Sequence, residues 1–320
     1  MGPYLTVPKR EKASEDGENA KLKYGATGMQ GWRNTMEDSH IAELDLGNGI
    51  SFFGVYDGHG GNEVADFVRD HLANELKQLA SFKSGDYDQA LKDIYLRIDE
   101  MLKTTYGKQK LMSYKKQSDS SASLFGRGNS SEDVAFAAGC TACSAIITPT
   151  EIIVGNSGDS RAVLARKSST PGGKFTAVEM SVDHKPELPE EKQRIERAGG
   201  FVEDNRVKGV LNLSRSLGDL EYKSDSSIPL KDQMITAMPE IKRETVGKDG
   251  AFLIIACDGI WDCLTSQEAV DYVGDLLTNK KREKISQTIE DMFDKIIAQD
   301  VASSGGIGCD NMTCVVIQFK

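Results

Sequence analysis

The sequence predicts an α+β protein built as a four-layer α-β-β-α sandwich, with two antiparallel sheets face to face and helices on their outer faces. Apolar, β-prone segments outnumber helix candidates, and they occur in consecutive groups rather than in strict βαβ alternation. Amphipathic helix candidates stand between the groups, each with one apolar face to bury. Two sheets packed face to face under helix pairs satisfy both patterns.

The N-terminal part contributes a tail, strands and two helices. Residues 1–20 are polar, and we expect a flexible tail there, followed by one domain over 21–320. Two strand signals and a glycine turn come first in that domain. A helix is predicted from Asn62 to Leu79, where the apolar residues share one face, and a second from about Tyr87 to Thr105.

The middle of the chain reads as a loop followed by strands. The stretch 116–133 is rich in Ser and Gly and predicts a long, mobile loop. Strands are predicted in AFAAGCTACSAIIT, EIIVGNSGD and RAVLARK, and the short turns between them indicate an antiparallel meander. An apparent insertion at Lys167–Lys174 separates the last of these from the next strand. Either loop contacts a substrate or regulator, or is inert surface, and inert is the better expectation.

The C-terminal part alternates helices with two strongly apolar strands. The expected elements are a charged helix at 186–199 ended by two glycines, an irregular stretch at 201–234, a buried strand at 251–257, a helix opened by the Thr265–Glu268 capping box, a helix at about 282–299, and a final strand, MTCVVIQF.

Composition excludes several classes of function. The chain has 320 residues and a formal net charge of -10, which disfavours nonspecific nucleic-acid binding. No apolar run approaches the ~20 residues of a membrane span, and no hydrophobic signal region opens the chain, so we expect a cytoplasmic, and also nuclear, monomer. Gly2 loosely fits a myristoylation pattern, and membrane contact is expected only if it is acylated.

Six cysteines are scattered along the chain. Cys140 and Cys143 form a C-x-x-C, but no second pair or histidine cluster completes a zinc site. Residues three apart in a strand point to opposite faces, which also argues against joint ligation. We therefore predict reduced thiols in the core.

Acidic residues recur at strand ends, and this is the pattern that carries chemistry. The residues concerned are Glu37 and Asp38, Asp57 in the turn Asp57-Gly58-His59, Asp258 with Asp262 four residues on, Asp310, and Asp159 as a further candidate. A lone Asp-Gly is usually a turn, and Arg33 or His59 alone is most often a surface or hydrogen-bonding residue. Three aspartates at the ends of apolar strands, with a Glu-Asp pair, favour a site for hard divalent cations such as Mg²⁺ or Mn²⁺.

Competing motifs are incomplete. Glu63 stands where the third glycine of a dinucleotide-binding loop belongs, and no Gly-Lys pair is followed by the Ser or Thr of a phosphate-binding loop. No G-x-S-x-G nucleophile elbow occurs.

Together these segments resemble the metal-dependent protein phosphatases of type 2C. The similarity runs from about residue 22 to 320 through, in family order, RNTMEDSH, FGVYDGHGG, AGCTACSAII, VGNSGDSRAVL, DHKPELPEEKQRIERAGG, GVLNLSRSLGD, ACDGIWD and CDNMTCVVI. The resemblance implies an α-β-β-α sandwich that hydrolyses phosphoserine and phosphothreonine in phosphoprotein substrates at a binuclear Mn²⁺ or Mg²⁺ centre.

The resemblance also implies a role for each matched residue. Asp57 bridges both metals, Glu37 and the Gly58 carbonyl complete one ion, and Asp258 and Asp310 hold the other. Asp38 orients a metal-bound water, Arg33 grips the phosphate, and His59 protonates the leaving alkoxide. Asp159 and Asp262, with Asp258, match a weaker third-metal position. A metal-activated water then attacks phosphorus in line, with no covalent intermediate.

Two other classes of protein are alternatives to an active phosphatase. A catalytically dead scaffold that binds a partner would have lost metal ligands, whereas Glu37, Asp57, Asp258 and Asp310 are all present. A two-metal phosphodiesterase acting on nucleic acid is disfavoured by the acidic net charge.

Overall fold

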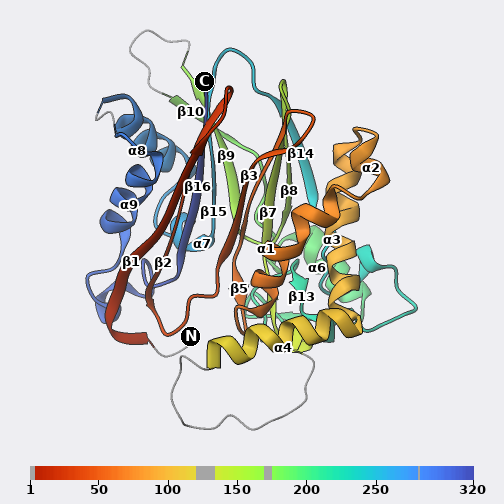
Figure 1. Ribbon diagram of the computed structural model, residues 1–320. Coiled ribbons are helices and arrows are strands. Elements are labelled where there is room, and N and C mark those ends of the chain that lie inside the picture. Colours follow the sequence, from red (N-terminus) through yellow and green to blue (C-terminus); the bar gives the residue numbers. More distant parts are fainter. Residues whose placement is uncertain (1–3, 120–133, 169–174, 280–281) are drawn as a thin grey trace.

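Two antiparallel sheets pack face to face in the computed structural model, which describes residues 4–119, 134–168, 175–279 and 282–320 (Figure 1). The six-stranded sheet has the order β1-β2-β16-β15-β9-β10. Its strands are Tyr4–Glu18, Leu22–Arg33, Met312–Phe319, Gly250–Ala256, Arg161–Lys167 and Phe175–Glu179, in that order. The five-stranded sheet has the order β14-β8-β7-β4-β3. Its strands are Glu240–Thr245, Glu151–Ser157, Ala142–Ile147, Ile50–Tyr56 and Ser39–Gly47.

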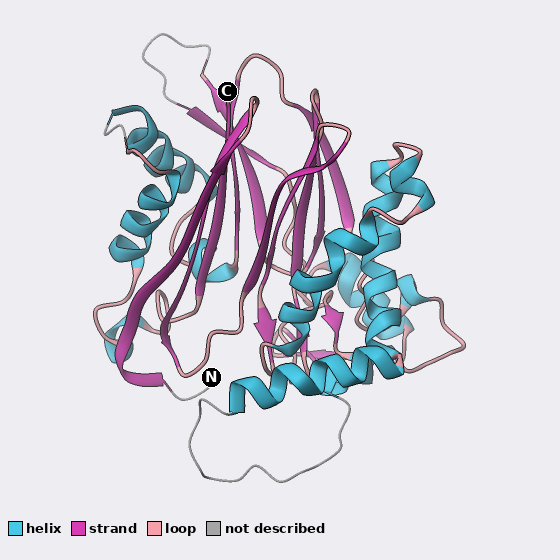
Figure 2. Cartoon of the chain, viewed as in Figure 1, coloured by secondary structure: helices cyan, strands magenta, loops and turns pink. Residues whose placement is uncertain are grey.

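Helices cover both outer faces (Figure 2). Those on the five-stranded sheet are α1 (Glu63–Leu76) and α3 (Tyr87–Lys103), and those on the six-stranded sheet are α8 (Ser266–Asn279) and α9 (Ile285–Ile296). The remaining helices are α2 (Ala80–Lys83), α4 (Thr105–Asp119), α5 (Val134–Ala137), α6 (Pro189–Arg197), α7 (Asp258–Trp261) and α10 (Val301–Ser304). The predicted α+β sandwich of two antiparallel sheets with outer helices is confirmed.

Smaller elements surround one end of the sandwich. A three-stranded sheet joins β13 (Leu217–Gly218), β6 (Gly139–Cys140) and β5 (Gly58–His59), and a hairpin joins β11 (Val202–Glu203) and β12 (Arg206–Val207). Two 3-10 turns, η1 (Leu220–Lys223) and η2 (Leu230–Asp232), follow. The stretch predicted to be irregular, 201–234, is thus made of short elements rather than long ones.

The central strands are apolar on both faces because each lies between two cores. In β15, Phe252 and Ile254 pack toward α8 and α9, whereas Leu253 and Ile255 pack between the sheets. Strands buried on both faces read as continuous apolar runs rather than as an alternation. This accounts for the unbroken AFLIIA segment, whose residues are all buried.

The N-terminal prediction was wrong for the described residues 4–18. This segment forms β1, which pairs with β2 from Tyr4 opposite Arg33 to Glu18 opposite Lys23. Its polar side chains contact the outer helix α9: the Asp16 carboxylate accepts hydrogen bonds from the Ser286 amide (2.9 Å) and hydroxyl (2.5 Å). An edge strand exposes much of its surface, so its composition resembles that of a tail.

The predicted meander was also wrong in one connection. β7 and β8 pair within the five-stranded sheet, but β9 lies in the other sheet, between β15 and β10. The chain changes sheets at Gly158, whose φ of 118° lies in the region that favours glycine. A short turn signal does not distinguish a hairpin from such a crossing.

Smaller boundaries also differ. Residues 116–119 end α4 instead of opening a loop, and 120–133 lie outside the described residues, as do 169–174 of the second insertion. The segment Val134–Ala137 is a helical turn rather than the start of a strand. The capping box is confirmed, since Glu268 accepts from the Thr265 amide at 2.9 Å and the Glu268 amide donates to the Thr265 hydroxyl at 3.3 Å. Within the described part of the chain, no helix is long and apolar enough to cross a membrane.

Candidate active site

The predicted site residues gather at one end of the sandwich. Arg33 ends β2, Asp57 follows β4, Asp258 follows β15, Asp159 follows β8, and Asp310 precedes β16. A cavity of about 350 Å³ opens there. Its lining includes Arg33, Glu37, Asp57, Gly58, His59, Asp159, Asp258 and Asp310. Strand ends hold these side chains on a rigid scaffold, which is what a site with fixed ligand geometry needs.

Asp38 and Asp262 stand apart from that lining. Asp38 lies next to Asp57 and lines an adjacent cavity with Met36 and Thr313. Asp262 follows the single turn of α7 and is exposed, and partial desolvation together with the neighbouring carboxylates raises the pKa of its carboxyl. The structure therefore brings eight of the ten predicted residues to one cavity and places the other two beside it.

The glycine turn brings Gly58 against Glu37. A Cβ added at Gly58 would lie 2.3 Å from the Glu37 carbonyl oxygen, so this approach requires glycine. The Glu37 carboxylate accepts hydrogen bonds from the Thr35 hydroxyl (2.7 Å) and the Gly61 amide (3.1 Å). Its backbone amide donates to Asn311 Oδ1 at 3.0 Å, which ties the Glu37 segment to the start of β16.

Three half-buried carboxylates in this region, Asp38, Asp57 and Asp258, form no ion pair with a described residue, unlike Asp159 and Asp310. Burial, and then the charges of neighbouring carboxylates, raise the pKa of Asp57 and of Asp258 well above the ordinary range. Burial raises the pKa of Asp38 to about 6. Neither carboxylate oxygen of Asp38 has a hydrogen-bond partner among the described residues. Such a cluster of negative charges destabilises the fold unless a cation binds to it.

The donor set fits hard divalent cations. Ligand atoms of Asp38, Asp57 and Cys257 lie within 4.8 Å of one another. The Cys257 thiol accepts a hydrogen bond from the Thr313 amide at 3.2 Å, and burial raises its pKa well above the ordinary value, so it remains a neutral thiol. The carboxylate oxygens and the Gly58 carbonyl are then the ligands, and oxygen ligands select Mg²⁺ or Mn²⁺. All six cysteines are free, and five are buried, as predicted for core thiols.

Arg33 is held by an acid of the same cluster. Its Nη2 donates to Asp310 Oδ2 at 2.5 Å, while its side chain stays 41% exposed. Its Nε has no hydrogen-bond partner among the described residues. One edge of the guanidinium is thus fixed, while Nη1, which bonds to no described residue, remains for an anion in the cavity.

His59 has a partner that sequence reasoning missed. Its Nε2 lies 2.8 Å and 3.0 Å from the two carboxylate oxygens of Asp219, which also accepts from the Ser216 hydroxyl. Burial opposes the charged imidazolium, but Asp219 outweighs it and raises the pKa of His59. Asp219 belongs to the motif SLGD, and that motif was the only signal available. The two residues are 160 positions apart, so only the fold pairs them.

A buried ion pair holds the Asp219 segment in place. Lys223 donates to Asp99 of α3 at 2.5 Å and to the Ser216 carbonyl at 2.7 Å. The other oxygen of Asp99 accepts from the Gly218 amide at 2.9 Å. The residues on both sides of Asp219 are therefore fixed to a helix of the outer layer.

Asp159 also has a partner from elsewhere in the chain. Lys185 forms an ion pair with its Oδ2, and Asp159 is nearly fully buried. Burial opposes the charged ammonium, but Asp159 outweighs it and raises the pKa of Lys185. Unlike Asp57 and Asp258, this carboxylate is neutralised within the chain. His184, next to Lys185, is buried.

Comparison with known proteins identifies the family. The family model described as "Protein phosphatase 2C" matches residues 22–305. This chain belongs to the protein phosphatase 2C family. "Probable protein phosphatase 2C 3" of Paramecium tetraurelia is 45% identical over 322 residues and is covered completely, as is this chain. "Probable protein phosphatase 2C 21" of Arabidopsis thaliana is 42% identical, covering 100% of this chain and 93% of the relative.

A solved structure shares the fold. The crystal structure of a serine-threonine phosphatase 2C from Toxoplasma gondii matches with a TM-score of 0.71 at 21% identity, covering 99% of this chain and 98% of that one. Family membership makes the protein a metal-dependent protein serine/threonine phosphatase, a hydrolase. The resemblance inferred from the sequence is confirmed.

Proposed function

We propose that this phosphatase hydrolyses phosphoserine and phosphothreonine in protein substrates at a binuclear Mn²⁺ or Mg²⁺ centre. Asp57, Glu37, the Gly58 carbonyl, Asp258 and Asp310 would hold these cations, with Asp57 placed to serve both. The observation that carries this proposal is the cluster of half-buried carboxylates that have raised pKa values and no ion-pair partner among the described residues. When bound, such cations act as Lewis acids and acidify water into a nucleophile.

The protein's own groups bind the phosphate and move protons. Arg33 donates from its unpaired edge to the phosphate oxygens and offsets the charge that develops on them. Asp38 orients the attacking water through its unpartnered oxygens. No covalent intermediate with the protein forms in this scheme, because the carboxylates at the cavity serve as ligands.

His59 protonates the leaving alkoxide, and Asp219 holds its ring. A Ser or Thr alkoxide is a poor leaving group, so a positioned acid is worth about 10²–10⁴ in rate. The raised pKa of His59 favours the protonated, donating form. Because Asp219 is bonded to Nε2, the proton to be transferred would be on Nδ1, and Asp219 is a positioning residue.

A weaker third cation at Asp159, Asp262 and Asp258 would have to displace Lys185. The Lys185 ammonium already neutralises Asp159. We therefore propose that this third position fills only at cation concentrations well above those that fill the first two.

The test is hydrolysis of a phosphothreonine peptide with Mn²⁺, with and without a chelator, alongside metal counting by calorimetry. We expect two strongly bound ions per chain and activity that disappears with the chelator. Asp57→Asn should lower kcat by on the order of 10³-fold or more and reduce the number of bound ions. Asp45→Asn, at an exposed position near the end of β3, is the matched control and should change neither.

The same experiment separates the enzyme from a scaffold. A catalytically dead scaffold would bind a phosphopeptide without turnover at any Mn²⁺ concentration. Activity that survives the chelator, or survives Asp57→Asn, would contradict the binuclear mechanism.

A further inference from the structure

A second cavity lies at the opposite end of the sandwich from the candidate active site. Its volume is about 520 Å³, within the ~300–1,000 Å³ range of small-molecule sites. Strand ends of both sheets line it: Leu22 opens β2, Ser51 is the second residue of β4, and Phe319 ends β16. β4 begins beside this cavity and ends at Asp57, and its seven residues span about 20 Å. The two cavities are therefore separate.

The chemistry of this second cavity is unlike that of the first. Its walls are mainly apolar, with Ile147 only 3% and Leu22 only 5% exposed, and with Val246 and Phe319 half-buried. None of its fourteen lining residues is acidic, and two are lysines. On a chain with a net charge of -10, an acid-free pocket bearing lysines favours an anion over a cation.

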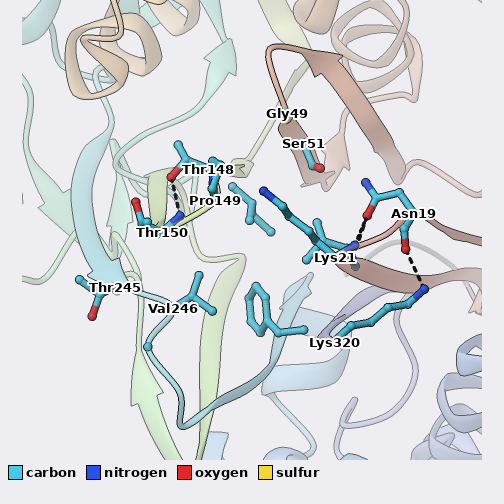
Figure 3. Close-up of a pocket in the computed structure, with 14 residues that line it drawn as sticks. Asn19, Lys21, Gly49, Ser51, Thr148, Pro149, Thr150, Thr245, Val246 and Lys320 are labelled. Carbon is cyan, nitrogen blue, oxygen red and sulfur yellow. Dashed lines mark hydrogen bonds between the residues drawn. The ribbon is translucent and has the colours of Figure 1, made fainter.

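Lys21 supplies the free positive charge. The Lys320 ammonium is already bound to Glu18 (2.8 Å) and to the Asn19 carbonyl (2.7 Å). The exposed Lys21 ammonium has no hydrogen bond or ion pair with any described residue. Figure 3 shows the Lys21 side chain extended across the pocket toward Pro149.

Hydrogen bonds fix both rims of the cavity. On one side Asn19 Oδ1 accepts from the backbone amides of Lys21 and Leu22, each at 2.9 Å. On the other side the Val246 amide donates to the Thr150 carbonyl at 2.9 Å, which joins two loops of the five-stranded sheet. A pocket held in this way is formed before a ligand arrives, so little ordering opposes binding.

We propose that this cavity binds a free medium-chain carboxylate, with the aliphatic chain between the two sheets and the carboxylate on Lys21. The apolar walls take the chain, and the unpaired ammonium at the rim takes the head group. An acyl group attached near the N-terminus does not fit, because Tyr4 pairs with Arg33 at the active-site end of β1. Because Glu18 pairs with Lys23, the eleven residues of β2 from Lys23 to Arg33 place that end ~35 Å from Glu18, beyond the reach of one acyl chain.

The probes are octanoate and 1-octanol, which share a chain and differ in charge. We expect saturable octanoate binding, followed by amide shifts in a ¹⁵N-labelled sample that centre on Ile147, Val246 and Phe319. Octanol should bind about threefold to fivefold more weakly, the worth of one exposed charge contact. Equal binding of the two probes would overturn the role of Lys21.

Variants complete the test. Lys21→Gln should weaken octanoate about threefold to fivefold and leave octanol unchanged, and Lys21→Glu should weaken it further. Lys92→Gln, on α3, is the matched control and should change neither. Val246→Trp should fill the cavity and abolish binding of both probes, with circular dichroism to check its fold. Neither Lys21 variant requires repacking of the core. Absence of saturable binding, or amide shifts centred on Asp57 and Asp258, would overturn the proposal.

Discussion

The protein holds two groups of carboxylates whose surroundings are opposite. Glu191 of α6 accepts from Arg194 (2.6 Å), Arg215 (2.6 Å) and the Ser214 hydroxyl (2.7 Å). Burial opposes its ionisation, but these partners outweigh it and lower the pKa of Glu191 to about 2. Asp57 and Asp258 are only half-buried, yet desolvation and neighbouring carboxylates raise their pKa values. The paired Glu191 is structural, whereas Asp57 and Asp258, which form no ion pair with a described residue, are available to bind cations.

The largest effect is expected where the pairing is complete. Glu191→Gln leaves Arg194 and Arg215 without their counter-ion, so the free energy of unfolding should fall by about 3 kcal/mol in urea titrations. Glu196→Gln on the same helix, where the side chain is 54% exposed, is the control and should have little effect. A loss of unfolding free energy no larger than in that control would mean that the paired Glu191 cluster does not stabilise the fold.

Asp219 is an intermediate case, because its partner is the titratable His59. Asp219→Asn keeps the shape but removes the charge that holds His59 protonated. We expect kcat for a phosphothreonine peptide to fall about tenfold to a hundredfold, with a smaller loss for p-nitrophenyl phosphate, whose leaving group needs no proton. Asp225→Asn, exposed in the same segment, should be neutral. Equal losses on the two substrates would show that Asp219 acts on the fold rather than through His59.

A smaller effect should reverse sign with metal. In metal-free buffer Asp258→Asn removes one of several repelling carboxylates, so the free energy of unfolding should rise by about 1 kcal/mol. In Mn²⁺ the same variant should be less stable than the wild type, because it has lost a ligand. Thermal unfolding with and without the ion measures both. Destabilisation in metal-free buffer would place Asp258 in the paired, structural group.

The smallest effect is a pH dependence of opposite sign in the two groups. The pKa of Glu191 is lowered, so its contribution is present above pH 4.5 and is lost as pH falls toward about 2. The pKa of Asp38 is raised from 3.8 to about 6, so metal-free protein should lose stability as pH rises across that window. Asp38→Asn should make this fall in stability shallower. It should not remove the fall, because neighbouring carboxylates share the titration. A free energy of unfolding that rises between pH 4 and 6 in the metal-free wild type, but not in Asp38→Asn, would contradict the raised pKa of Asp38.

The sequence was sufficient for the residues that end apolar strands. Asp57 and Asp258 each follow a run of buried residues, and the sheets bring such ends together. Partners supplied by distant segments were not readable. Asp219 and Lys185 reach His59 and Asp159 only through the fold, and no local pattern says which residue either of them pairs with.

Two features of the fold were unreadable for physical reasons. β1 is polar because it is an outer strand, so its composition resembles that of a tail. The turn between β8 and β9 is as short as a hairpin turn, yet it joins different sheets. Local patterns fix whether a segment is extended, but its partner strand is decided by packing.

The outer position of β1 has a consequence for solubility. β1 has a paired neighbour only on the β2 side, and β2 itself is buried at nine of its twelve positions. Without β1, a long apolar strand with unpaired backbone groups would form the rim of the sheet, a template for other chains to add to. The charged run Lys9-Arg10-Glu11-Lys12 instead occupies that rim, and it keeps neighbouring molecules from extending the sheet.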